Sequence, residues 1–318
     1  MKKCIVFIIA SMIFAITPCY GQAQPPAGND SRAKLSVVTT IFSPYDFMRE
    51  VAGDNADITM LLPPGSESHS YEPTPQDIIK IQNCDIFIYT GGNSEAWVDR
   101  ILSSMNTISM NVIKLVDCVE AVEEDIVEGM ENDQDNDHEE EDVEYDEHVW
   151  TSPKNAKIII QKILDTLCEI DAVNANAYKA NATAYIEKLD ALDAAFKEVV
   201  NSAVRKTIVF GDRFPFRYFV DAYGLDYFAA FPGCSTETEP SARTVAFLIN
   251  KIKKEAIPVV FHIELSNEKM ARTISEETGA KVLLLHSCHN ITRDDFQSGK
   301  GYLDLMKQNV TALKEALK

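Results

Sequence analysis

The sequence predicts an α/β protein with two lobes, each a mostly parallel sheet flanked by helices, joined by one long rigid linker helix. Apolar strand-like runs alternate with helical segments, and unbroken apolar runs are typical of parallel strands covered on both faces. The chain has 318 residues, 46% of them hydrophobic, which is enough for two domains of roughly 100 to 150 residues. Residues 174–203 repeat apolar side chains at helical spacing, and one helix of that length would extend about 45 Å.

The N-terminus has the pattern of a secretory signal. Lys2 and Lys3 precede an apolar stretch at residues 5–16 and then small residues, so we expect a signal peptide over residues 1–23. The rival is a lipidated Cys19, which Pro18 makes less favourable. Residues 24–34 are rich in polar, Pro and Gly residues, which predicts a flexible leader. We therefore expect the protein in the periplasm or on the outer face of the cytoplasmic membrane.

The first predicted lobe covers residues 35–152. Its strands are expected at 35–39, 58–62, 85–90 and 112–116. Its helices are expected to begin at Pro44, at Pro75 and near Ser94. Ser43 and Thr74 each precede a proline, the arrangement of an N-cap followed by the first helical residue.

An acidic tract at residues 120–147 interrupts this lobe. It holds 16 Asp and Glu residues and no Lys or Arg, whereas the whole chain has 49 acidic and 30 basic residues and a net charge of −19. Self-repulsion predicts a mobile loop. Its alternatives are a weak cation collector, with His138 as its one histidine, or a solvated linker.

The remaining chain repeats the alternation. Residues 153–205 are expected to be helical and to include the linker helix. The second lobe covers residues 206–318, with strands expected at 207–210, 225–231, 259–263 and 282–285. Its helices are expected from Pro215, Pro240 and about Asn267, and at 302–317.

Two histidines occupy similar turns. His69 lies between an apolar strand and the helix expected at Pro75, at the carboxyl end of a strand, where open α/β sheets bind ligands. Several prolines restrict its loop. His148 precedes the N-cap Ser152 and Pro153 of another helix. Two histidines beside helix starts suggest a metal site.

Several ordered motifs then carry a resemblance. They are PPGSESHSYEPTPQDI, NCDIFIYTGGNSEAW, the acidic tract and DEHVWTSPKNA. In these the chain resembles the zinc and manganese solute-binding proteins of bacterial ABC transporters, the cluster A-I type, over nearly all of its mature length. The resemblance implies two α/β lobes, one long connecting helix and a divalent transition metal in the cleft. It also implies that His69 and His148 are the first two ligands.

The chain departs from the family's third ligand, usually a histidine after the first strand of the second lobe. Counting back from Tyr223 puts this position on Arg213, whose guanidinium has no lone pair to offer a cation. Compensation is available in LLHSCHN, where alignment puts His286 about at the family's acidic ligand. We expect His69, His148 and His286 to form the site, with His289, water, Asp212 or Glu264 in the fourth position.

Other residues near this site leave alternatives. Glu264 matches a family acid, and its other role would be to accept a hydrogen bond that orients an imidazole. His262 is expected in the core. Cys234 and Cys288 favour a disulfide over thiolate ligation or free thiols, and Cys84 with Cys118 could be paired or free.

Three imidazoles favour zinc as the transported ion; manganese or iron would need Glu264 and Asp212 as additional ligands. The expected function is a monomeric receptor that captures the ion and delivers it to a membrane ABC permease, without catalysis. Alternatives are an adhesin of the same fold or a zinc hydrolase, which no H-E-x-x-H signature supports. The acidic chain has no basic patch for nucleic acid.

Overall fold

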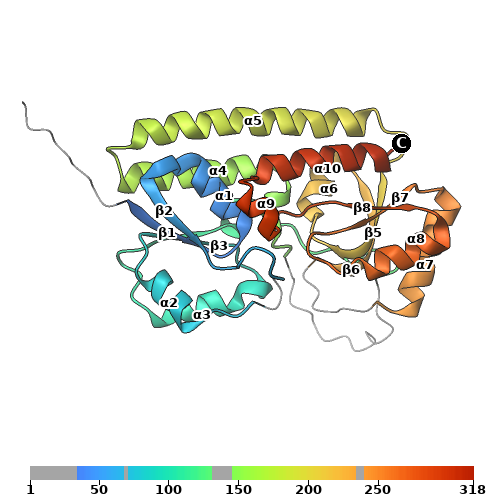
Figure 1. Cartoon of the computed structure of the whole chain (residues 1–318), viewed down its shortest axis with the longest axis horizontal. Helices are drawn as coiled ribbons and strands as arrows, with labels where there is room; N and C mark the ends of the chain where they lie inside the picture. The colour runs from blue at the N-terminus through green and yellow to red at the C-terminus, as the bar shows by residue number, and fades with distance from the viewer. Residues whose placement is uncertain (1–33, 68–70, 131–144, 234–239) are drawn as a thin grey trace, which may run out of the picture. The chain divides into compact units, whose positions relative to one another are not determined.

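The computed structural model describes residues 34–67, 71–130, 145–233 and 240–318 (Figure 1). Within these residues lie two sheets, each of four parallel strands and each flanked by helices. The predicted α/β class with two lobes is therefore confirmed. The residues after Ala33 form one compact unit. The predicted signal peptide and leader lie outside the described residues, apart from Lys34.

The first sheet has the strand order β2-β1-β3-β4. Its strands are β1 (Leu35–Thr39), β2 (Ala56–Met60), β3 (Ile86–Tyr89) and β4 (Asn111–Lys114). The helices that follow its strands are α1 (Phe42–Ala52), α2 (Pro75–Gln82) and α3 (Ala96–Ser104), with short 3-10 turns at Gly53–Asn55, Asn93–Glu95, Val116–Cys118 and Val149–Thr151. The four residues of β3 are all buried, as expected for a strand in a covered parallel sheet.

The second sheet repeats this order as β6-β5-β7-β8. Its strands are β5 (Thr207–Phe214), β6 (Asp226–Pro232), β7 (Val259–His262) and β8 (Lys281–Leu284). The helices that follow them are α6 (Arg217–Tyr223), α7 (Ala242–Glu255), α8 (Lys269–Thr278), α9 (Arg293–Gln297) and α10 (Tyr302–Ala316). Strand β5 extends past its predicted end at Phe210, through Asp212 and Arg213, after a register shift against β6.

Two helices connect the halves of the fold, α4 (Pro153–Ile170) and α5 (Ala175–Asn201). The 27 residues of α5 confirm the predicted long helix, which extends about 40 Å at 1.5 Å per residue. In Figure 1, α5 runs past both sheets, and it packs against α1 and α4 at one end and against α10 at the other. The helix thus contacts both halves along its length.

One hydrophobic core runs through both halves. It includes Val37 and Trp150 from the first half, Phe210 from the second sheet and Phe196 from α5. All four side chains are fully buried. Because apolar contacts continue from one sheet to the other, both sheets contribute to the same packing interior.

The capping predictions were right for one helix and wrong for another. Thr74 caps α2 in a reciprocal capping box with Asp77, and Pro75 follows at the first helical position. Helix α1, however, begins at Phe42 with Ile41 as its N-cap, so Ser43 is not a cap. Its hydroxyl instead donates to Cys288 O at 2.5 Å. The Ser43 hydroxyl thus bonds to a residue 245 positions away rather than to the start of its own helix.

The acidic tract is held at both ends. Glu123 pairs with Tyr145 in an antiparallel bridge, and Val122 N donates to Tyr218 Oη at 3.2 Å. Met130 is buried. In the described part of the tract, residues 120–130 and 145–147, side chains between the acidic residues thus find apolar and backbone partners, and the mobility of the loop stays a prediction. His138 lies outside the described residues.

The cysteines of the described chain carry free thiols. Cys84 and Cys118 are not bonded to each other, and Cys288 is fully buried and free. The predicted disulfide of Cys288 with Cys234 is therefore wrong, and Cys234 itself lies outside the described residues. Burial raises the pKa of the Cys288 thiol well above its ordinary value, so it is a poor thiolate ligand.

Candidate metal centre

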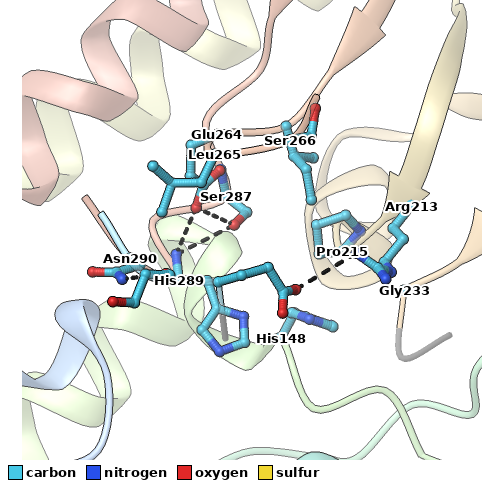
Figure 2. A pocket seen from close by; sticks show the side chains of 13 residues that line it. His148, Arg213, Pro215, Gly233, Glu264, Leu265, Ser266, Ser287, His289 and Asn290 are labelled. Atoms are coloured by element: carbon cyan, nitrogen blue, oxygen red, sulfur yellow. Dashed lines mark hydrogen bonds and ion pairs between the residues drawn. The ribbon is translucent and has the colours of Figure 1, made fainter. Parts of the chain in front are cut away.

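A small cavity lies where the two halves of the fold meet. Its walls come from the 3-10 turn after Glu147, from the end of β5, from the chain after β7 and from the chain after β8 (Figure 2). The cavity measures about 40 Å³, and since a water needs roughly 10 to 15 Å³ measured in this way, only an ion with a few small groups fits.

His148 is the fully buried imidazole of the first wall. Its Nδ1 lies 3.1 Å from Asp146 Oδ1, which also accepts from His148 N at 2.7 Å. A carboxylate at Nδ1 favours the tautomer with the proton there, so the lone pair is left on Nε2. That Nε2 is buried and has no hydrogen-bond partner among the described residues. The arrangement is that of an imidazole prepared to bind a metal.

The electrostatics of His148 depend on its acidic neighbours. Burial lowers the pKa of His148, but the carboxylates of Asp146 and Glu147 more than offset burial and raise it overall. The same carboxylates would stabilise a bound cation. Space for the ring depends on Gly233, because a Cβ at that position would lie 3.2 Å from His148 Cε1.

His289 is the imidazole of the opposite wall. It belongs to residues 286–291, which follow β8 and are here called the His289 loop. The ring centroids of His289 and His148 are 5.7 Å apart, and both rings contact Trp150 edge to face. His289 and His148 both line the cavity (Figure 2). The fold thus brings one imidazole from each half to the same small space.

Glu264 also lines the cavity, but its oxygens are already used. Oε2 accepts from Ser287 N at 2.7 Å, and Oε1 accepts from Ser287 Oγ at 2.6 Å and from His289 N at 3.0 Å. These bonds fix the backbone that carries His289. The contacts fit the alternative role given to Glu264, an acceptor that orients a ligand loop, better than direct ligation.

His286, the expected third ligand, is not among the residues that line the cavity. Its Nδ1 accepts from Cys288 N at 3.0 Å, which favours a neutral tautomer with the proton on Nε2 and no free lone pair. Burial lowers the pKa of His286, in opposition to Glu264. In the structure His289, given only as a possible fourth ligand, lines the cavity, whereas His286 does not.

Arg213 lines the cavity at the place where the resemblance implied a histidine. Its Nη1 lies 3.7 Å from Glu67 Oε1, so this ion pair joins β5 to the chain after β2. Asp212, a candidate for the fourth position, does not line the cavity. Its carboxylate accepts from Arg213 N at 2.9 Å and from Ile263 N at 3.2 Å.

The remaining histidines complete the comparison with the sequence. His69 lies outside the described residues, and His262 lies at the end of β7 with Nδ1 3.0 Å from Ile263 O. In the part of the chain that the structure describes, no three His, Cys, Asp or Glu side chains converge as metal ligands. The described site thus supplies only part of a ligand set.

Sequence reasoning did not single out Asp146, Trp150 or Asn290 for this site. The spacing of Asp146 and His148 in DEHVW could have indicated the pair, because an Asp side chain often accepts from the backbone N–H two residues on, as Asp146 does from His148 N. The contacts of Trp150 and Asn290 reach residues more than 130 positions away, and no local pattern signals them. None of the described helices is long and apolar enough to cross a membrane.

Comparisons with known proteins agree with one another. A family model described as zinc-uptake complex component A, periplasmic, matches residues 37–316. The zinc-binding lipoprotein AdcA of Streptococcus pneumoniae is 33% identical over 99% of this chain, which spans 61% of that relative's length. The high-affinity zinc uptake system protein ZnuA of Bacillus subtilis is 31% identical over 98% of this chain and 97% of its own. The Zn(II)-bound ZnuA-like domain of S. pneumoniae AdcA is 33% identical, with a TM-score of 0.73 over 89% of this chain and 99% of that domain.

Proposed function

The chain belongs to the family of periplasmic component A of zinc-uptake complexes, and on this basis we propose that it captures Zn²⁺ and delivers it to a membrane ABC permease. The proposal places the protein outside the cytoplasmic membrane, as a monomeric receptor with no catalytic step. Family membership supports a transport receptor over the zinc hydrolase considered from the sequence. The names of the relatives support zinc as the ion.

The observation that carries the proposal is the state of His148. A buried imidazole with a carboxylate at Nδ1 and no partner at Nε2 is costly in a folded protein unless a ligand uses the lone pair. A divalent transition metal is the ligand that neutral imidazoles prefer. The contact of His148 with His289 from the other half supports capture between the halves.

The proposed ligand set is His69, His148 and His289, with water in the remaining position. Glu264 is assigned to the support of the His289 loop, and His286 is left out of the ligand set. Zinc tolerates three protein ligands and one water in a tetrahedral site. Imidazole ligands favour zinc over manganese, which prefers oxygen. Manganese stays the alternative if Glu264 releases its hydrogen bonds to coordinate.

The test is zinc binding to the full chain, measured by competition with a chromophoric chelator and by thermal unfolding. Zinc at 100 times its Kd should stabilise the native protein by about 2.7 kcal/mol. His148→Ala should weaken zinc binding by at least about 100-fold, because each good ligand contributes several kcal/mol. His262→Ala is the matched control, since His262 does not line the cavity, and should bind zinc as the wild type does. A wild-type chain that binds no zinc, or a His148→Ala variant with normal affinity, would refute the proposal.

A further inference from the structure

The His289 loop is held from two sides. Its N–H groups face the second half, where Ser287 N and His289 N donate to Glu264. The carbonyls of Ser287 and His289 face the first half, where Ser287 O accepts from Trp150 Nε1 at 2.8 Å and His289 O accepts from Phe42 N at 3.0 Å. The loop belongs to the second half by sequence but is hydrogen-bonded to both halves.

Asn290 is the side chain of this loop that reaches the chain after β2. Its Nδ2 donates to Pro63 O at 2.9 Å and to Ser66 O at 2.7 Å, and its Oδ1 accepts from Ile291 N at 2.8 Å. Asn290 is only 2% exposed. Both amide hydrogens and the carbonyl oxygen are therefore engaged.

The segment that Asn290 holds leads toward His69. Ser66 lies three positions before that histidine in the sequence. A backbone bond from Gly65 N to Ile291 O, at 2.8 Å, runs beside the two bonds from Asn290. The chain that carries His289 and the chain that leads to His69 are thus joined next to the cavity, which Ser66 and Asn290 both line.

We propose that Asn290 is a positioning residue for metal binding, which sets the place of the His289 loop against the chain that leads to His69. This inference rests on the proposed function. If the protein itself holds the two segments together, they lose little conformational entropy when the metal binds. The affinity for the metal is higher for that reason. Without the amide, Ser66 O loses the Asn290 donor and Pro63 O keeps only the bond from Ser66 N, so the two segments lose two of the bonds that join them and can separate more easily when the metal leaves.

The test replaces Asn290 and measures zinc affinity and zinc dissociation in the full chain. Asn290→Asp keeps the shape and Oδ1 but removes both donors, and Asn290→Ala removes the whole amide. Both variants should bind zinc at least about tenfold more weakly, equivalent to about 1.4 kcal/mol. The loss should appear as faster dissociation into excess chelator, since such changes act mainly on dissociation rates. If both variants fold poorly, Asn290→Ser, which keeps one donor, should give an intermediate dissociation rate.

Asn309 of α10 provides the matched control. It is also 2% exposed and bonds to the same loop twice, since it accepts from His286 N at 2.7 Å and donates to His286 O at 2.7 Å. These bonds and its contact with Met306 Sδ all lie within the second half. Asn309→Ala should therefore lower the melting temperature without a change in zinc dissociation.

The outcomes separate the two claims. Asn290 variants that release zinc at the wild-type rate while only their melting temperature falls would overturn the positioning role and leave the receptor intact. Equal acceleration in the Asn290 and Asn309 variants would also overturn it, because the effect would then follow general loosening of the loop. A wild-type chain that binds no zinc would instead refute the proposed function.

Discussion

His148 and His286 are both buried, and both have an Nε2 without a hydrogen-bond partner, yet their surroundings give them opposite chemistry. The Nδ1 of His148 lies 3.1 Å from the carboxylate of Asp146, whereas the Nδ1 of His286, although 3.6 Å from Glu264 Oε2, accepts from the amide of Cys288 at 3.0 Å. The first contact leaves the lone pair on Nε2 of His148 for a metal. The second uses the lone pair on Nδ1 of His286. The partner at the other ring nitrogen therefore decides which buried histidine can act as a ligand.

The carboxylates near the two histidines differ in the same way. Both oxygens of Glu264, near His286, accept hydrogen bonds from the His289 loop. Glu147, next to His148, has a buried Oε1 with no hydrogen-bond partner among the described residues, and burial raises its pKa. The carboxylate near His286 is therefore satisfied, whereas the one next to His148 keeps an unused oxygen, which fits a site that a cation completes.

The largest effect on this contrast is expected from Asp146→Asn. Loss of the negative charge beside Nδ1 makes His148 a weaker electron-pair donor to the metal and removes the preference for the tautomer with the proton on Nδ1. Zinc affinity should therefore fall by about 10- to 100-fold. Asp212→Asn is the control, because Asp212 accepts from the backbone N–H groups of Arg213 and Ile263 and does not line the cavity. It should change affinity by less than about threefold. Equal losses in the two variants, measured by chelator competition, would mean that general acidity near the cavity matters rather than the Asp146–His148 pair.

A smaller effect, of opposite sign, is expected from Arg213→His. The change removes a positive charge from the cavity wall and adds an imidazole there, so zinc affinity should rise by about tenfold. Arg213→Gln removes the charge alone and should give a smaller gain. If neither variant binds zinc more tightly in the same competition assay, the ion pair of Arg213 with Glu67 contributes more to the site than its charge costs.

The smallest effect on this contrast is expected from Glu95, a buried acid in the same half of the fold as His148. Burial, with help from the charge of Glu147, raises the pKa of Glu95 from 4.5 to about 7. The folded protein thus keeps a proton that the unfolded chain releases, and stability falls as pH rises through this window. Glu95→Gln should remove that slope and gain roughly 2 to 3 kcal/mol in the free energy of unfolding at pH 8, with a much smaller change at pH 5. Denaturant titrations at both pH values measure it, and parallel curves for variant and wild type would contradict the assignment.

Much of the fold could be predicted because local signals agreed with the final packing. Alternating apolar runs placed the strands to within a few residues, and the spacing from Tyr178 to Phe196 predicted α5 because one helix face is buried along its whole length. The capping box of Thr74 and Asp77 is a local structure and was visible in the sequence.

The candidate site was harder to predict because it depends on contacts between distant segments. The choice between His286 and His289 turns on Cys288, whose φ of 59° reverses the chain between them. The backbone of His286 is in turn held by Asn309 of α10, a contact between residues 23 positions apart that no local pattern signals. Alignment on a strand end could locate the loop but could not say which of its side chains enters the cavity.

Zinc affinity of His289→Ala beside His286→Ala tests the central claim most directly, because the two variants remove imidazoles three positions apart in one loop. We expect His289→Ala to weaken zinc binding by at least about 100-fold and His286→Ala to change it by less than about threefold. The reverse order, with His286 essential and His289 dispensable, would contradict the account.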